Sequence, residues 1–306
     1  MSRVLVTRVI DPVGVALLEK AGFDVDVRIA DAPIARQELL DRVRGCAGLI
    51  PMPTDRVDGA VLDAGPLRVV ANHAVGTDNV DLDAARVRGI PVTNTPGVLT
   101  EATADLALTL LLAAARRVGE GQALIREGRF HGWAPDMLVG ADLNGATLGI
   151  VGLGRIGRAV ADRARAFGLQ VMGRTQSAGP SLETLLAESD FLSLHCPLTP
   201  DTRHLIGAAE LRAMKPTAVL VNTARGPVVD EAALVQALTE GWIAAAGLDV
   251  FEHEPRVHPG LLDLPNAVLL PHLGSATRSS RQAMSRLAAQ GAIAVLTGRE
   301  PAHRVA

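Results

Sequence analysis

The chain has 306 residues, 48% of them hydrophobic, which is enough for two domains of roughly 100–200 residues with a core each. Its 30 basic and 33 acidic residues give a net charge of −3 without any basic block. This balance excludes the charge pattern of a protein that binds nucleic acid or an acidic membrane, and it favours a small-molecule partner.

Neither cysteine has a CxxC or Cys/His ligand spacing, so we expect Cys46 and Cys196 to be reduced structural thiols in a cytoplasmic protein without a metal site. Cys196 as a nucleophile is the lesser alternative. The first residues, MSRVLVTRVI, lack the features of a signal peptide. The most apolar helical segment, residues 106–115, is too short to span a bilayer.

The first third of the chain alternates short apolar runs with helical patterns. Strands are expected over residues 4–6, 24–27, 47–50, 69–71 and 91–93. Asp11 followed by Pro12 is typical of a helix cap and first helical position. The alternation predicts a small α/β unit with a mostly parallel sheet. Thr100 then begins a long apolar helix to about Arg117, and a stretch that contains Gly and Trp follows up to Asn144.

Residues 148–157 read LGIVGLGRIG, a glycine-rich turn between a strand pattern and a helical pattern. Gly152 permits the tight turn, Gly154 lets the backbone approach a pyrophosphate, and Gly157 lets the helix pack against its strand. The helix N-terminus adds unpaired N–H groups and a partial positive charge. A second apolar run at 169–172 completes a βαβ unit, so the pattern predicts a dinucleotide-binding site.

Arg174 stands where such units usually carry an acidic residue that binds the ribose 2′-OH. The site reads GRTQS, and no acidic residue occurs between 173 and 180. Arg174 can make charge-assisted hydrogen bonds to a 2′-phosphate, with the hydroxyls of Thr175 and Ser177 nearby. An ordinary solvated arginine is the alternative, but the missing acid favours NADPH over NADH.

The alternation resumes after the glycine-rich turn and predicts a doubly wound sheet. The expected strands of this second unit are residues 146–151, 169–172, 191–194, 218–221, 244–248 and 268–270. Helices are expected near 207–214 and 230–240, and the short segment 177–181 indicates a reduced helix between the second and third strands. A last helix, at about 275–296, would make the first domain discontinuous if it packed there, which periodicity alone does not decide.

Three residues with catalytic chemistry follow strands of this unit: Arg225 in VNTARGPVVD, Glu254 in GLDVFEHEP and His272 in LLPHLGSAT. The carboxyl ends of parallel strands face the ligand crevice, so all three can converge there. For a 2-oxo acid, His272 suits proton donation, Arg225 suits the carboxylate and carbonyl, and Glu254 suits the orientation of His272. Singly, such a histidine is more often a helix cap and Glu before Pro only a turn, but together the three favour catalysis.

Further motifs follow in order along nearly the whole chain. They are TDRVDGAVLDAGP, VGTDNVDLDAA, TNTPGVLTEATADLALTLLLAAARR, LGIVGLGRIG, LHCPLTPDTRHLI, NTARGPVVDEAAL, GLDVFEHEP and PHLGSAT. This series resembles the D-isomer-specific 2-hydroxyacid dehydrogenase family, most of all its glyoxylate/hydroxypyruvate reductase branch. The resemblance implies an α/β protein of two doubly wound domains, with a Rossmann dinucleotide-binding domain (99–274) inserted in a flavodoxin-like substrate domain (1–98 and 275–306). It also implies a homodimer joined through the dinucleotide-binding domain.

The resemblance implies a role for further residues. It assigns catalysis to Arg225, Glu254 and His272. Substrate contacts are implied for Met52, Pro53, Val75, Gly76, Arg225 and His272. Besides Gly152, Gly154, Gly157, Arg174, Thr175 and Ser177, cofactor contacts are implied for Leu153, Arg155, Ile156, Cys196, Pro197, Thr202, Thr223, Ala224, Asp249 and Thr103. Trp133 and Met137 would reach the partner subunit, with local packing as the equal alternative.

These observations predict NADPH-dependent reduction of a small 2-oxo acid, glyoxylate or hydroxypyruvate first, to the D-2-hydroxy acid or to glycolate. The alternatives are a dehydrogenase for another 2-hydroxy acid, such as phosphoglycerate or an aryl acid, and a nucleotide-sensing scaffold like the corepressors that share the fold. The chain contains no Tyr, which excludes a Tyr-dependent short-chain reductase. Thr77 replaces an aromatic residue common in the family and leaves one wall of the substrate pocket open to question.

Overall fold

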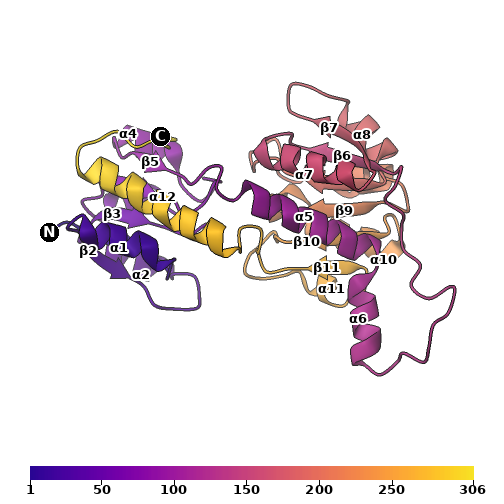
Figure 1. Ribbon diagram of the computed structural model, residues 1–306. Helices are drawn as coiled ribbons and strands as arrows, with labels where there is room; N and C mark the ends of the chain where they lie inside the picture. Colours follow the sequence, from indigo (N-terminus) through magenta and orange to yellow (C-terminus); the bar gives the residue numbers. More distant parts are fainter. The chain divides into compact units, whose positions relative to one another are not determined.

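The computed structural model describes residues 1–306, which form two compact units. Unit 1 comprises residues 1–99 and 276–306, and unit 2 comprises residues 100–275 (Figure 1). These limits differ by one residue from the domain boundaries expected from the sequence. None of the helices combines the length and the apolar character needed to cross a membrane.

Unit 1 is built on a five-stranded, fully parallel sheet of order β2-β1-β3-β4-β5. Its strands are β1 (Arg3–Val6), β2 (Asp24–Val27), β3 (Cys46–Ile50), β4 (Val69–Ala71) and β5 (Val92–Thr93). Its helices are α1 (Pro12–Lys20), α2 (Arg36–Val43), α3 (Gly59–Asp63), α4 (Leu82–Val87) and α12 (Arg278–Leu296). This strand order is that of flavodoxin-like folds, as expected.

The last helix, α12, completes unit 1 by packing on α1 (Figure 1). Gly14 makes the close approach possible, because a Cβ there would lie 2.3 Å from the Ser285 hydroxyl oxygen. That hydroxyl donates a 2.7 Å hydrogen bond to the carbonyl of Asp11, the residue that caps α1. The first and last segments of the chain therefore share one core, and unit 1 is discontinuous in sequence.

Unit 2 carries a six-stranded parallel sheet of order β11-β10-β9-β8-β6-β7. Its strands are β6 (Thr147–Val151), β7 (Gln170–Arg174), β8 (Phe191–Leu194), β9 (Val219–Asn222), β10 (Ala245–Leu248) and β11 (Ala267–Leu269). Its helices are α5 (Thr100–Ala115), α6 (Val118–Arg126), α7 (Arg155–Ala166), α8 (Leu182–Glu188), α9 (Ala208–Ala213), α10 (Glu231–Glu240) and α11 (Pro259–Leu262), with a 3₁₀ helix, η1, at Gly226–Val228.

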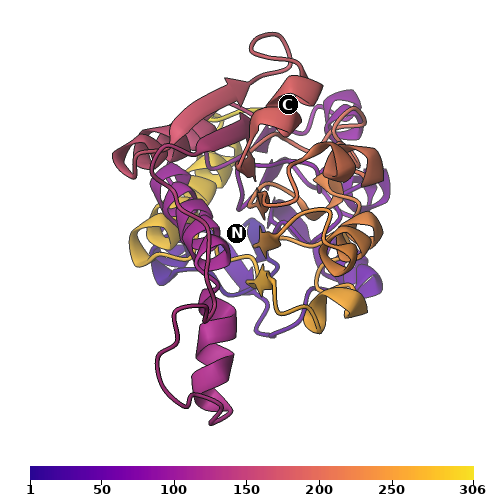
Figure 2. The same ribbon diagram turned by 90° about the vertical axis from the view of Figure 1, so that its right-hand side faces the viewer.

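Two apolar cores lie on opposite faces of this sheet. Phe191 of β8 packs with α5 and α7, whereas the next residue, Leu192, packs with α8, α9 and α10. Such alternation buries both faces, which is why the strands read as continuous apolar runs. In Figures 1 and 2, α6 and the loop after it project from this packed body of unit 2, and so does the loop between β7 and α8.

Most expected strands lie within two residues of the observed ones, but several helices differ. The sequence interpretation missed α6, which follows a left-handed residue, Arg117 (φ 52°), and buries no side chain. The last helix begins at Arg278 rather than at about 275, because the Thr277 hydroxyl accepts a hydrogen bond from the Ser280 N–H and caps it there. The helix α8 has only seven residues, as the short segment before it predicts.

Candidate active site

The glycine-rich turn joins β6 to α7 in the way its residue types predict. Gly152 has φ +98°, and a Cβ there would lie 2.6 Å from backbone atoms of His195 and Cys196 on the neighbouring segment. A Cβ on Gly157 would lie 2.2 Å from the Gly152 carbonyl oxygen. Both positions therefore require glycine.

The N-terminus of α7 is shaped to receive an anion. Gly154 caps the helix without any side-chain hydrogen bond, and a Cβ on it would meet no atom within 4 Å. The first-turn N–H groups of an α-helix have no intrahelical acceptor and attract phosphate. The residues present therefore fit the pyrophosphate of a dinucleotide.

Arg174 is the last residue of β7 and is tied to the glycine-rich turn. Its carbonyl accepts a 2.9 Å hydrogen bond from the Gly152 N–H. The chain then turns sharply, because Thr175 donates its N–H to the Ala178 carbonyl and accepts the Ala178 N–H at its hydroxyl. The Thr175 hydroxyl thus helps to hold the turn beside Arg174.

The segment after β8 holds other residues expected at the cofactor. Burial raises the pKa of the Cys196 thiol to about 11, so it stays protonated and offers no nucleophile. Thr202 closes a turn by donating to the Pro197 carbonyl at 2.7 Å. Thr223, after β9, has its hydroxyl 3.4 Å from Nδ1 of His195, a residue whose burial lowers its pKa to about 4.

The three predicted catalytic residues follow β9, β10 and β11, and two of them form a direct pair. His272 Nδ1 lies 2.9 Å from Glu254 Oε2, and Glu254 Oε1 accepts a 3.0 Å hydrogen bond from the Phe251 N–H. The pKa of Glu254 is lowered, although burial alone would raise it. The lowering comes from the hydrogen bond and charge of His272, the hydrogen bond from the Phe251 N–H and the charge of Arg225. Glu254 is therefore an anion that lies against the imidazole and can orient it.

Arg225 is positioned by the backbone that follows β9. The Asn222 side chain donates to the Arg225 carbonyl at 2.9 Å and accepts the Ala224 N–H at 3.0 Å. A Cβ on Gly226 would lie 1.9 Å from the carbonyl carbon and oxygen of Phe251. The Arg225 loop is thus pressed directly against the turn that carries Glu254.

The loop of His272 is fixed by two residues expected to contact the cofactor. Asp249 accepts the His272 N–H at its carbonyl (2.8 Å), and its carboxylate accepts the N–H groups of Leu273 (2.6 Å) and Gly274 (2.8 Å). The Thr103 hydroxyl donates to the Gly274 carbonyl at 3.0 Å. These anchors hold His272 in a left-handed conformation (φ 57°). The sequence analysis did not predict this anchoring role of Asp249 and Thr103.

In unit 1 the residues expected to contact substrate lie on loops held by hydrogen bonds to the polar side chains of Asn72, Asn94 and Asp55. Asn72 donates to the Gly76 carbonyl and Asn94 to the Val75 carbonyl, both at 2.8 Å. Asp55 accepts the Met52 N–H at 2.8 Å. The carbonyl groups of Val75 and Gly76 therefore both accept hydrogen bonds from asparagine side chains. The sequence analysis did not predict these roles of Asn72 and Asn94.

A doubly wound parallel sheet with a glycine turn at its crossing point, and with an arginine and a carboxylate–imidazole pair after its strands, defines a dinucleotide-binding α/β protein. The family model described as D-isomer specific 2-hydroxyacid dehydrogenase, NAD binding domain, matches residues 108–274. The chain belongs to the D-isomer specific 2-hydroxyacid dehydrogenase family, in its glyoxylate reductase branch, and is an oxidoreductase. The predicted family and fold class are confirmed.

Relatives match over nearly their whole length. The glyoxylate reductase of Thermococcus litoralis is 47% identical, covering 99% of this chain and 96% of its own. A Thermus thermophilus protein of known crystal structure has a TM-score of 0.94 and 51% identity over 99% and 100% of the two chains. The NADPH-dependent glyoxylate/hydroxypyruvate reductase of Sinorhizobium meliloti, solved with NADP and malonate, has a TM-score of 0.85 and 37% identity over 100% and 97%.

Proposed function

We propose that this protein is an NADPH-dependent reductase of small 2-oxo acids, glyoxylate and hydroxypyruvate first. The 2.9 Å pair of His272 and Glu254 carries the proposal, because a charged carboxylate behind an imidazole equips that ring to deliver a proton. The names of relatives that match end to end support the substrate class.

The glycine-rich turn and the N-terminus of α7 would hold a dinucleotide, which would supply the hydride for the substrate carbonyl carbon. Nδ1 of His272 is engaged by Glu254, so Nε2 is the nitrogen that gives its proton to the carbonyl oxygen. Arg225 binds the substrate carboxylate and polarises the carbonyl. Met52, Val75 and Gly76 remain predicted substrate contacts.

The preference for NADPH is a separate part of the proposal and depends on Arg174. Arg174 is the last residue of β7, and its carbonyl is hydrogen-bonded to Gly152 of the glycine-rich turn. Residues 173–180 include no carboxylate that would repel a 2′-phosphate. A phosphate also matches the planar donor fork of an arginine. The Sinorhizobium relative is named as NADPH-dependent, which supports the assignment.

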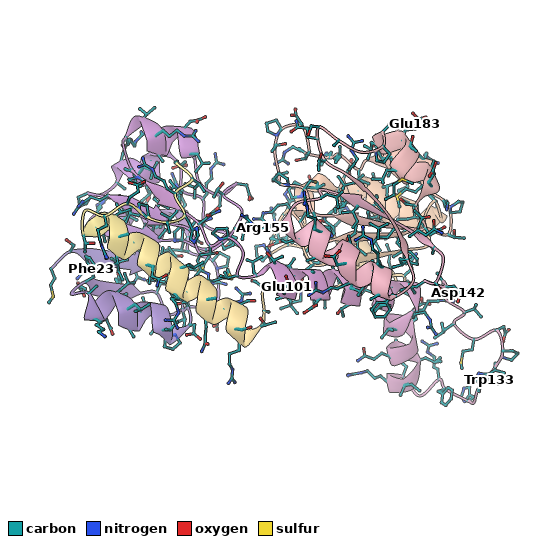
Figure 3. The ribbon with its side chains drawn as sticks, turned by 45° about the horizontal axis from the view of Figure 1, so that its top comes forward. Phe23, Glu101, Trp133, Asp142, Arg155 and Glu183 are labelled. Atoms are coloured by element: carbon teal, nitrogen blue, oxygen red, sulfur yellow. The ribbon has the colours of Figure 1, made fainter.

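We further propose a cytoplasmic homodimer. Apolar side chains on and after α6 are exposed, among them Ile125, Phe130 and Trp133, the last at 82% (Figure 3). An exposed apolar group of this kind indicates a protein interface. Two buried free thiols, Cys46 and Cys196, support a reducing compartment. Sedimentation of Trp133→Ala tests the dimer: a weaker dimer is expected, and an unchanged one contradicts this interface.

Initial rates for a panel of 2-oxo acids with NADPH and NADH in parallel test the function. We expect the fastest reduction with glyoxylate or hydroxypyruvate and NADPH. The His272→Asn variant should still bind NADPH but should catalyse almost no reduction. Preference for a bulky aryl acid or a phosphorylated acid would reassign the substrate. Cofactor binding without reduction of any 2-oxo acid would point instead to a nucleotide-sensing scaffold.

A further inference from the structure

Two glutamates of unit 2, Glu231 and Glu252, lie outside the proposed catalytic trio and are linked by hydrogen bonds between side chain and backbone. Glu231 is the first residue of α10, and Glu252 lies in the turn that carries Glu254. The Glu252 N–H donates to Glu231 Oε1 at 2.5 Å, and the Glu231 N–H lies 3.4 Å from Glu252 Oε2. Each side chain therefore accepts a backbone N–H of the other segment.

The surroundings of this pair show that it is a built feature. Glu231 is only 5% exposed, and burial raises its pKa against the opposing effects of the Glu252 N–H and the His253 and His258 charges. The Glu252 side chain is 13% exposed, and its Oε1 lies 2.6 Å from His204 Nε2. Placing two carboxylates together in a buried site is unfavourable unless their oxygens are hydrogen-bonded, as they are here.

The pair acts on the backbone that presents Glu254. In this turn the Phe251 N–H binds Glu254 itself, and the next N–H, that of Glu252, binds Glu231. On the side of the Arg225 loop, Gly226 lies against the Phe251 carbonyl. The turn is thus confined between Gly226 and Glu231, with Glu254 held 2.9 Å from His272.

We propose that Glu231 is a positioning residue, whose carboxylate holds the Glu252 N–H and so keeps Glu254 in register with His272. The effect on reduction rests on the proposed function, in which His272 donates the proton. The effect on the Glu254–His272 pair does not rest on it and can be measured without substrate.

The reach of the side chain distinguishes positioning from a simple effect of charge. Glu231→Gln keeps an acceptor at the same reach but loses the charge, whereas Glu231→Asp keeps the charge but is one methylene shorter. Positioning predicts that Gln resembles the unmutated protein and that Asp resembles Glu231→Ala. A charge effect predicts the reverse order.

The first measurement is the pH titration of the Glu254 side-chain carboxyl carbon by NMR on the full chain, assigned with Glu254→Gln. The hydrogen bond and charge of His272 lower the pKa of Glu254, so a Glu254 that is no longer held against His272 should titrate at higher pH; Asp249 and Arg225 are the other charged groups that act on this site. We expect the midpoint to move to higher pH by about half a unit or more in the Ala and Asp variants, a roughly threefold change in the protonation equilibrium.

The second measurement is steady-state reduction of glyoxylate at pH 7. We expect kcat to fall roughly threefold or more in the Ala and Asp variants, because the imidazole of His272 is then less well oriented, with an unchanged KM for NADPH. Glu183→Ala is the matched control, because Glu183 also lies in the first turn of a helix, α8, but is exposed (Figure 3).

A titration midpoint that does not move in Glu231→Asp, or that moves equally in Glu183→Ala, overturns the proposal. So does a shift in the Gln variant as large as in the Ala variant. If Ala does not fold, the comparison of Asp with Gln decides alone. A protein that reduces no 2-oxo acid would refute the proposed function, while the titration would still test Glu231.

Discussion

Replacing Glu254 by Gln removes the negative charge behind His272 while keeping the side-chain shape. The lost bond measures 2.9 Å, and hydrogen bonds to charged groups are worth about 1.5–3 kcal/mol. His272 is 36% exposed, so solvent screening places the loss in the lower part of that range, about 1.5–2 kcal/mol. Because this bond holds the imidazole in the orientation that delivers the proton, its loss corresponds to a fall of roughly 10- to 30-fold in kcat/KM for reduction.

The assay is the initial rate of NADPH oxidation with glyoxylate between pH 5.5 and 9. In the proposed mechanism His272 gives a proton to the carbonyl oxygen, so the rate of reduction should fall as pH rises. Without the Glu254 carboxylate the rate should be lower over the whole range, because the imidazole is no longer held in place. Glu300→Gln, a change at an exposed glutamate of unit 1, should leave the profile unchanged. A Glu254→Gln enzyme within twofold of the unmutated protein at every pH would refute the assigned role.

Three further changes test separate parts of the structure. Arg174→Ala should weaken NADPH binding by about 1.5–3 kcal/mol and barely change NADH binding, as measured by fluorescence titration; an equal loss for both would contradict a 2′-phosphate contact. Gly226→Ala should destabilise unit 2 by about 1–3 kcal/mol or more in urea unfolding, because its Cβ would overlap the Phe251 carbonyl, whereas Gly119→Ala has open space. Burial lowers the pKa of His195 from 6.5 to about 4. The free energy of unfolding should therefore be complete above pH 6.5 with respect to this group and should decrease as pH falls towards 4, by about 2–3 kcal/mol between pH 7 and 4.5. In His195→Gln this pH dependence should be absent.

The strands were predictable because both faces of these sheets are covered. A strand such as β8 is buried at every residue and reads as an apolar run that ends where burial ends. The helix α6 offered no such signal, since it buries none of its residues and begins after a left-handed arginine held by Glu120. Periodicity indicates burial, so a helix that buries none of its residues is hard to recognise from it.

The placement of the three proposed catalytic residues after successive strands was predictable for a topological reason. Parallel strands place their carboxyl ends at one edge, so Arg225, Glu254 and His272 could be chosen by their chemistry and by their position after strands. The anchors Asp249 and Glu231 could not, because they bind backbone N–H groups of segments elsewhere in the chain. Every residue except proline has a backbone N–H group, so the sequence does not indicate which N–H group an anchoring carboxylate binds.

These two anchors explain how a pair of side chains from two loops can be preorganised. Asp249 holds the loop of His272 through three backbone N–H groups, and Glu231 holds the turn of Glu254 through one. Both anchors follow or begin regular elements, β10 and α10, and so transfer the rigidity of the sheet and its helices to the loops. Because they bind only the backbone, side chains elsewhere in these loops can change without moving the catalytic pair. Substitutions at the two anchors should therefore impair proton transfer far more than substitutions of exposed neighbours such as His253 or Leu273.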